Sequence, residues 1–276
     1  MAQNTDDECR DARYVDNNGV SLRVDRFGHG PEQLLFCHGW ISSRRMFHGL
    51  VGTLDATKFT LHLMDFRGCG LSDRVDVGHD LAGYASDLRT VLASISGEVT
   101  LIAHSMGARV AMVVAAERPK NLRRLILLAP GSPLSVRVDP RHYALMAQAY
   151  GVRARLAPFI AGSMAAHREA EIVERLVDDA LVAQREHWFG WYDHGRREDI
   201  LHLLPSISVP TLILSGSRDP LVSVGMLKRT LAPAIGGASL IQLKNVGHNL
   251  AIEAPDDVCE AIVRFSRSDI PNSSLH

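Results

Sequence analysis

Short apolar runs alternate with longer segments of helical character along most of this chain, and this alternation constrains the fold more than any other feature. Residues 99–103, 122–129 and 211–215 are short and largely apolar, which is typical of strands buried on both faces. Residues 80–95 instead carry apolar side chains at helical spacing. The alternation predicts a mostly parallel sheet whose right-handed crossovers are helices covering both faces.

The other predicted elements continue this pattern. The turn signal Asn17-Asn18-Gly19 between residues 13–16 and 20–27 predicts a hairpin at the start of the sheet. The remaining expected strands are 33–37, 59–66 and 239–243, and the remaining expected helices are 44–54, 106–117, 224–231 and 255–267.

Residues 132–204 interrupt the alternation, because they look helical and contain no clear strand. This stretch follows the sixth predicted strand. We therefore expect an α/β core formed by residues 1–131 and 205–276, with residues 132–204 as a helical cap over the C-terminal edge of the sheet. Ligands of open α/β sheets bind outside that edge, so a cap there would cover the site and exclude water.

Charge and composition exclude several classes of partner. The 276 residues include 30 Lys and Arg against 31 Asp and Glu, so the net charge of −1 gives no electrostatic case for binding nucleic acid or an anionic membrane. The polar N-terminal stretch lacks the apolar core of a signal peptide, and no apolar run is long enough to cross a bilayer. We expect a soluble, cytoplasmic monomer or homodimer whose four cysteines stay reduced.

The sharpest local signal is Ala103-His104-Ser105-Met106-Gly107, which joins a predicted strand to a predicted helix. A nucleophilic serine needs a tight strand-to-helix turn that pushes its hydroxyl out of the sheet, with small residues on both sides. Gly107 supplies one small residue, and Ala103 stands where glycine is more usual. Taken alone, Ser105 could be an N-cap serine, but the strand–turn–helix context favours the nucleophile.

Two later loops add a carboxylate and an imidazole. Asp219 follows the strand predicted at residues 211–215, and His248 lies on a glycine-containing loop after the last predicted strand. Singly, Asp219 would be a turn residue and His248 a surface histidine. The order Ser, Asp, His is the one expected when three loops at one sheet edge assemble a catalytic triad.

His38-Gly39-Trp40 follows the third predicted strand. Gly39 permits a sharp turn, so the backbone N–H of Trp40 can point at a developing oxyanion. The backbone N–H of Met106 would be the second donor of this oxyanion hole. His38 is expected to brace the loop by hydrogen bonding.

These motifs resemble those of the α/β-hydrolase-fold superfamily. The matching residues are His38-Gly39-Trp40, the loop 65–72, residues 103–107, Asp219 and Gly247-His248, so the resemblance extends over most of the chain. It implies a mostly parallel eight-stranded sheet with helices on both faces and a helical cap inserted after strand 6. It also implies roles for five residues: nucleophile Ser105, general base and acid His248, orienting carboxylate Asp219, and oxyanion-hole donors Trp40 and Met106.

The expected cap contains an aromatic cluster at residues 187–192. Trp188, Trp191 and Tyr192 could form the wall of an apolar substrate pocket. The competing interpretation is that these rings anchor the cap to the core. The charged run at residues 196–199 predicts a solvated face.

The leading functional hypothesis is a serine hydrolase that cleaves a carboxylic ester, lactone or thioester of a small apolar substrate through an acyl-enzyme. The alternative is a cofactor-free dioxygenase that cleaves an N-heteroaromatic ring of the hydroxyquinolone type with a His/Asp base on the same fold. Such proteins resemble this chain at His-Gly-Trp and at the elbow serine, but their acid follows the sixth strand, where this chain has Ala129-Pro130-Gly131-Ser132. A third reading is a non-enzymatic ligand receptor, against which the intact Ser, Asp and His set argues.

Neither a metal nor a cofactor is implied. The sequence has no cluster of metal ligands, no Cys-x-x-Cys pair and no phosphate-cradling loop.

Overall fold

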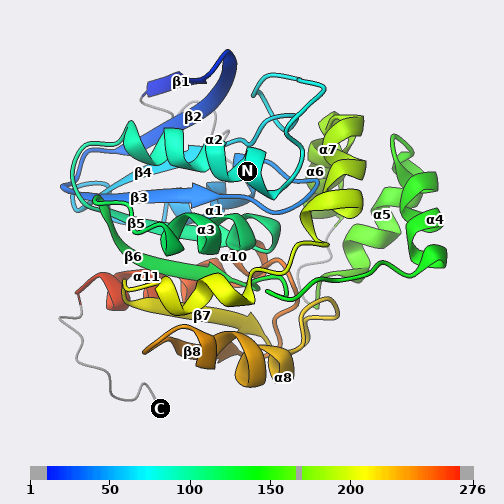
Figure 1. The fold of residues 1–276 in the computed structure, drawn as a ribbon. Coiled ribbons are helices and arrows are strands. Elements are labelled where there is room, and N and C mark those ends of the chain that lie inside the picture. Colours follow the sequence, from blue (N-terminus) through cyan, green and yellow to red (C-terminus); the bar gives the residue numbers. More distant parts are fainter. Residues whose placement is uncertain (1–10, 166–169, 268–276) are drawn as a thin grey trace.

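An eight-stranded sheet forms the centre of the molecule (Figure 1). The computed structural model describes residues 11–165 and 170–267. The strands are β1 (Asp11–Asn17), β2 (Val20–Gly28), β3 (Glu32–Cys37), β4 (Phe59–Met64), β5 (Val99–His104), β6 (Leu122–Leu128), β7 (Thr211–Gly216) and β8 (Ser239–Leu243). Their order in the sheet is β1-β2-β4-β3-β5-β6-β7-β8. The pairs β1–β2 and β2–β4 are antiparallel and the other five pairs are parallel, so the predicted mostly parallel sheet is confirmed.

Each face of the sheet has its own hydrophobic core. On one face, α2 (Leu81–Ala93) and α3 (Met106–Ala116) bury their apolar sides. On the other face, α1 (His48–Val51), α10 (Leu250–Glu253) and α11 (Pro255–Arg267) do the same. The central strands β3 and β5 contribute side chains to both cores, which explains why their sequences read as continuously apolar.

Two predicted helices are broken into shorter pieces. Residues 44–54 form the 3₁₀ turn η2 (Arg44–Phe47) followed by α1. Residues 224–231 form α8 (Val224–Met226) and the π-helical turn η5 (Leu227–Leu231), which runs into α9 (Ala232–Ala234). Pro233 lies in α9 and has no backbone N–H, so regular α-helical hydrogen bonding cannot continue through it.

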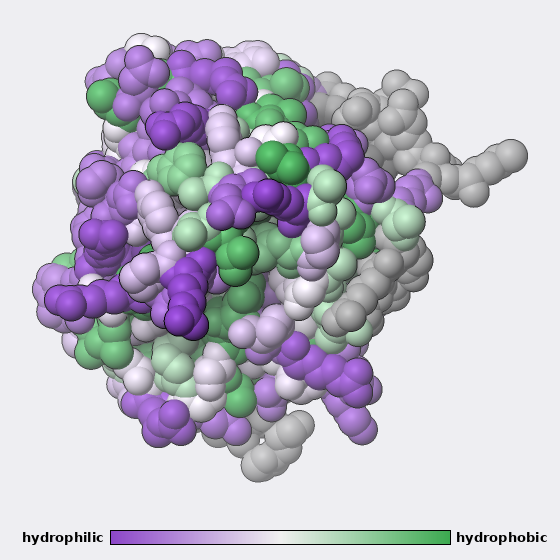
Figure 2. Space-filling view, turned by 90° about the vertical axis from the view of Figure 1, so that its right-hand side faces the viewer, coloured by the Kyte–Doolittle hydropathy of each residue, from purple (hydrophilic) through white to green (hydrophobic). Residues whose placement is uncertain are grey.

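The segment between β6 and β7, here called the insertion, is helical and lies beyond the ends toward which the parallel strands point (Figure 1). Its helices are α4 (Pro140–Ala149), α5 (Arg153–Gly162), α6 (Ala170–Val182), α7 (Arg185–Gly190) and the π-helical turn η3 (Trp191–Gly195), with the 3₁₀ helix η4 (Leu201–Ser206) leading back to the sheet. No strand occurs within its described residues. Figure 2 shows this side of the molecule, where hydrophobic residues gather near the middle and hydrophilic ones surround them.

Cys37, Cys69 and Cys259 are buried free thiols. Cys9 and the first ten residues of the N-terminal stretch lie outside the described part of the chain. Within the described ranges, no helix combines the length and apolar character needed to cross a membrane.

Candidate active site

Ser105 stands on the sharp turn between β5 and α3. Its backbone has φ 51° and ψ −108°, a conformation that residues other than glycine rarely adopt. The turn brings the start of α3 close to the end of β3. The approach leaves no room for a side chain at Gly107: an added Cβ would lie only 2.4 Å from the carbonyl oxygen of His38. Ala103, which stands where glycine is more usual, is fully buried in β5 and pairs with Cys37 of β3.

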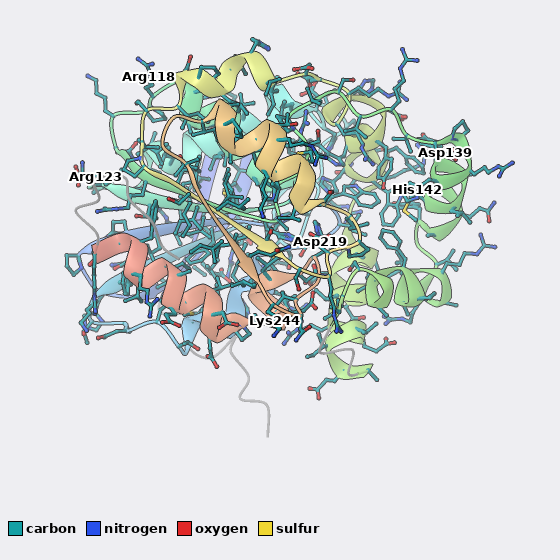
Figure 3. All side chains as sticks on the ribbon, turned by 90° about the horizontal axis from the view of Figure 1, so that it is seen from below. Arg118, Arg123, Asp139, His142, Asp219 and Lys244 are labelled. Atoms are coloured by element: carbon teal, nitrogen blue, oxygen red, sulfur yellow. The ribbon has the colours of Figure 1, made fainter. Side chains whose placement is uncertain are left out.

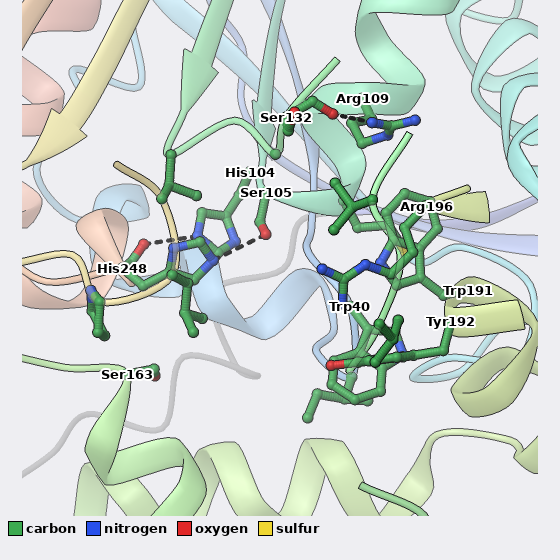
Figure 4. A pocket seen from close by; sticks show the side chains of 18 of the residues that line it. Trp40, His104, Ser105, Arg109, Ser132, Ser163, Trp191, Tyr192, Arg196 and His248 are labelled. Atoms are coloured by element: carbon green, nitrogen blue, oxygen red, sulfur yellow. Dashed lines mark hydrogen bonds between the residues drawn. The ribbon is translucent and has the colours of Figure 1, made fainter. Parts of the chain in front are cut away.

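The structure brings the three side chains of the predicted triad together. The Oγ of Ser105 lies 2.9 Å from Nε2 of His248, and Nδ1 of His248 lies 2.8 Å from Oδ2 of Asp219. The three residues follow β5, β7 and β8, whose C-terminal ends share one sheet edge. Figure 4 shows the contact between Ser105 and His248, and Figure 3 shows Asp219 on the side that faces α4, which carries Asp139 and His142.

Asp219 is held as a carboxylate. Its Oδ1 accepts hydrogen bonds from the backbone N–H groups of Leu221 and Val222 at 2.7 and 2.9 Å. Burial opposes the charge, but the bonds from His248 and from these two N–H groups keep the pKa of Asp219 below its usual value. The carboxylate of Asp219 accepts a hydrogen bond from Nδ1–H of His248, so Nε2 presents its lone pair to the hydroxyl of Ser105.

A second histidine fixes the backbone of the first. Nε2 of His104 lies 2.9 Å from the carbonyl oxygen of His248, and the two rings lie 4.8 Å apart. Burial lowers the pKa of His104 to about 3, so its ring is neutral and Nε2–H donates to that carbonyl. The N–H of His248 donates to the carbonyl of Ser163 in the insertion at 2.9 Å. The sequence pattern alone does not assign this role to His104, although the residue stands inside the elbow motif.

The two predicted oxyanion-hole donors lie on adjoining loops. Among the described residues, neither the N–H of Trp40 nor that of Met106 donates a hydrogen bond to another protein group. The Trp40 loop passes close to the turn that carries Ser105. A Cβ atom added at Gly39 would lie 3.3 Å from Cβ of Ser105. His38 braces this loop as expected, since its ring bonds the carbonyl of Gly39 and accepts the N–H of Phe66.

A buried chain of polar side chains ties the Trp40 loop to the insertion. Ile41 has a left-handed φ of 49°, and its N–H donates to Nε2 of His187 at 3.4 Å. Nδ1 of His187 therefore carries the ring proton and donates to the hydroxyl of Tyr84 at 2.7 Å. That hydroxyl in turn lies 3.1 Å from Nδ1 of His79. Each side chain in this chain of hydrogen bonds has a fixed donor or acceptor role. Because His187 belongs to the insertion, the conformation of the Trp40 loop depends on the insertion packing against the core.

A cavity of about 590 Å³ opens in front of Ser105 and His248, between the sheet and the insertion. Trp191 and Tyr192 line it, as does the side chain of Trp40, which packs against Tyr192 at 4.6 Å between ring centroids. Figure 4 shows these rings on the side of the pocket away from His248.

Two expectations about the insertion need correction. Trp188 does not line the pocket: it is 1% exposed in the core of the insertion, and its indole N–H donates to the carbonyl of Met146. Arg196 is not simply part of a solvated face, because the π-helical turn η3 places it at the pocket, where its guanidinium lies 4.9 Å from the centre of the Tyr192 ring.

Known proteins are similar to this sequence over most of its length. Residues 29–255 match the family model described as serine aminopeptidase, S33. The AB hydrolase superfamily protein YisY of Bacillus subtilis is 28% identical over 264 residues, which cover 90% of this chain and 96% of that protein. The 2-(acetamidomethylene)succinate hydrolase of Mesorhizobium japonicum is 27% identical over 275 residues, which cover 92% and 94%.

Solved structures show the same fold. An esterase from Exiguobacterium antarcticum superposes with a TM-score of 0.86 at 22% identity, covering 94% of this chain and all of the other. The enol-lactonase from Burkholderia xenovorans superposes with a TM-score of 0.81 at 20% identity, covering 92% and 100%. With the family match over residues 29–255, these likenesses place the chain in the S33 serine aminopeptidase family of α/β-hydrolase-fold enzymes.

Proposed function

We propose that the protein hydrolyses a carboxylic ester, lactone or thioester with a small, largely apolar body through an acyl-enzyme on Ser105. The observation that carries the proposal is the unbroken contact from Asp219 through His248 to the hydroxyl of Ser105, at the mouth of a cavity of about 590 Å³. The similar esterase and enol-lactonase structures and the related pimeloyl-[acyl-carrier protein] methyl ester esterases support this choice of substrate class.

In the first half-reaction, Oγ of Ser105 attacks the carbonyl carbon while Nε2 of His248 takes the hydroxyl proton. The negative charge that develops on the carbonyl oxygen would be bound by the N–H groups of Trp40 and Met106. The C–O or C–S bond to the leaving group then breaks, and His248 returns the proton to that group. The acyl group stays esterified to Ser105.

In the second half-reaction, His248 takes a proton from water, whose oxygen attacks the acyl-enzyme. Release of Ser105 regenerates its hydroxyl with the same proton, so one ester and one water yield one acid and one alcohol or thiol. Asp219 keeps the ring of His248 oriented and stabilises its cationic form during both transfers. In this proposal residues 132–204 act as the cap that excludes bulk water.

The geometry gives less support to the cofactor-free dioxygenase. That hypothesis needs an acid after the sixth strand, but the residues after β6 are Ala129, Pro130 and Gly131. The carboxylate that contacts His248 comes instead from the loop after β7.

A panel of p-nitrophenyl esters of rising chain length, lactones and a hydroxyquinolone tests the proposal. We expect the wild-type protein to hydrolyse at least one ester or lactone, and Ser105→Ala to lose about 10³-fold or more of kcat. The matched control Ser239→Ala, an exposed serine at the start of β8, should keep full activity. Oxygen consumption with the quinolone that survives Ser105→Ala would support the dioxygenase instead.

A further inference from the structure

The pocket in front of Ser105 carries an excess of positive charge. Three arginines line it, Arg109, Arg137 and Arg196, against a single acidic residue, Asp139. Oδ1 of Asp139 caps α4 by accepting the N–H groups of Arg141 and His142 at 2.8 and 3.2 Å. A low-dielectric cavity lined by charge of one sign concentrates ligands of the opposite sign.

Arg109 is a buried cation that forms no direct ion pair with a carboxylate of the described residues. Its side chain begins one turn after Ser105 in α3, and the residue is 2% exposed. The guanidinium donates only to backbone carbonyls, those of Ser132, Leu134 and Glu198, and its Nε has no hydrogen-bond partner among the described residues. Burial lowers the pKa of Arg109 to about 10, and the charge of Arg196 acts in the same direction, whereas the carboxylates of Glu198 and Asp199 act against it.

Arg196 is the more accessible of the two cations. Its guanidinium rests over the face of the Tyr192 ring, and it forms no ion pair with a carboxylate of the described residues. The next residue, Arg197, instead points to Asp193 at 4.0 Å. Figure 4 shows Arg196 beside Trp40 and Tyr192, on the other side of Ser105 from His248.

The guanidinium groups of Arg109 and Arg196 share one cavity and repel each other, and neither forms a direct ion pair with a carboxylate of the described residues. A bound carboxylate would remove this repulsion and would accept two N–H groups from the planar guanidinium fork. The Tyr192 ring holds that fork in place and reduces the entropy lost on binding.

We propose that Arg196 forms an anion subsite in this pocket and that the substrate is an ester carrying a carboxylate at the far end of an apolar linker. Arg109 strengthens the field but keeps its hydrogen bonds to backbone carbonyls. This inference rests on the proposed ester hydrolysis. It adds a charged end to the apolar body that Trp40, Phe159 and Trp191 would surround.

Matched substrate pairs test the subsite. One pair is a monomethyl ester of a dicarboxylic acid of four to eight carbons and its terminal carboxamide. The other is the acetate ester of an ω-hydroxy acid and its carboxamide, which moves the charge to the alcohol side. We expect the carboxylate member of one pair to have about 10- to 100-fold higher kcat/KM, the range of a charge-assisted hydrogen-bonded pair.

Arg196→Gln should abolish that preference, so that the carboxylate and carboxamide members of the pair have equal kcat/KM in this variant. Arg197→Gln is the matched control, because this exposed neighbour does not line the pocket, and it should keep the preference. Equal kcat/KM for charged and neutral members of both pairs would overturn the subsite.

A binding measurement on Ser105→Ala separates this inference from the proposed function. We expect adipate to bind at least tenfold more tightly than adipamide by calorimetry, and Arg196→Gln in the same background to remove the difference. If Ser105→Ala binds adipate but the wild-type protein hydrolyses no ester, the proposed hydrolase function is refuted and the anion subsite is supported. Ester hydrolysis without charge preference or Arg196-dependent binding would refute the subsite alone.

Discussion

At the scale of single residues, three side chains far apart in the sequence acquire their properties from their surroundings. The backbone at Ser105 is held in a left-handed conformation that exposes the hydroxyl. His248 is fixed at both ring nitrogens and at both backbone groups. Asp219 is kept charged by two backbone N–H groups and by His248. The proposed chemistry therefore depends on orientation as well as on residue type.

Asp219→Asn tests this dependence on orientation. An amide that donates to Nδ1 would favour the other tautomer of His248 and leave Nε2–H facing Ser105. We expect kcat for the best ester to fall about 10⁴-fold. The amide oxygen can still accept the N–H groups of Leu221 and Val222, so the melting temperature should change little. An activity loss below tenfold would show that the tautomer of His248 is not controlled by residue 219.

At the scale of secondary-structure elements, the site depends on how closely a helix, a strand and two loops approach. The end of β3, the elbow and the start of α3 meet at Gly107, and the Trp40 loop crosses above them. The insertion then fixes this loop through His187 and the loop of His248 through Ser163. Elements of the core and of the insertion thus hold the site jointly.

Gly107→Ala tests the close approach. The added Cβ would lie 2.4 Å from the carbonyl of His38 and 2.9 Å from that of Cys37, so backbone has to move. We expect a loss of about 1–3 kcal/mol in the free energy of unfolding, together with a lower kcat. Gly52→Ala is the matched control, because Gly52 has φ −76° and an added Cβ would contact nothing within 4 Å. Equal stability of the two variants would contradict the close packing.

The sequence predicts best the strands and helices whose own residue pattern determines them. β5, β6 and α3 lie within a residue or two of their expected ranges, because burial on both faces makes a strand continuously apolar and helical spacing marks the helix. Ser105, Asp219 and His248 could be found because each follows a recognisable strand. Trp188 and Arg196 could not be assigned correctly, because their surroundings depend on how the helices of the insertion pack over a distant sheet edge.

At the scale of the whole molecule, the fold buries several histidines in neutral form. Burial lowers the pKa of His104 to about 3 and that of His62 to about 4, and it also lowers the pKa values of His38 and His187. In the unfolded chain their pKa values lie near 6.5. The unfolded state therefore binds more protons below that pH, and the stability contributed by neutral burial, full above pH 6.5, is lost as the pH falls toward 4 and 3.

We therefore expect the free energy of unfolding to fall between pH 6.5 and 4, by up to about 1.4 kcal/mol per pH unit for each of His62 and His104. Urea unfolding at pH 7.5, 6 and 5 measures this slope. His62→Gln should reduce the slope by the contribution of one histidine. The exposed His29 shows no comparable burial, and His29→Gln should leave the slope unchanged. An unaltered slope in His62→Gln would contradict the assignment of His62 as a buried neutral group.

The central claim is that Ser105 is the nucleophile activated by His248 and Asp219. Labelling with a fluorophosphonate, followed by mass spectrometry of the intact protein and of its peptides, tests that claim most directly. We expect one adduct per chain, located on Ser105, with labelling slowed strongly in Asp219→Asn and absent in Ser105→Ala. An adduct on another residue, or a wild-type protein that hydrolyses esters without any labelling of Ser105, would contradict it.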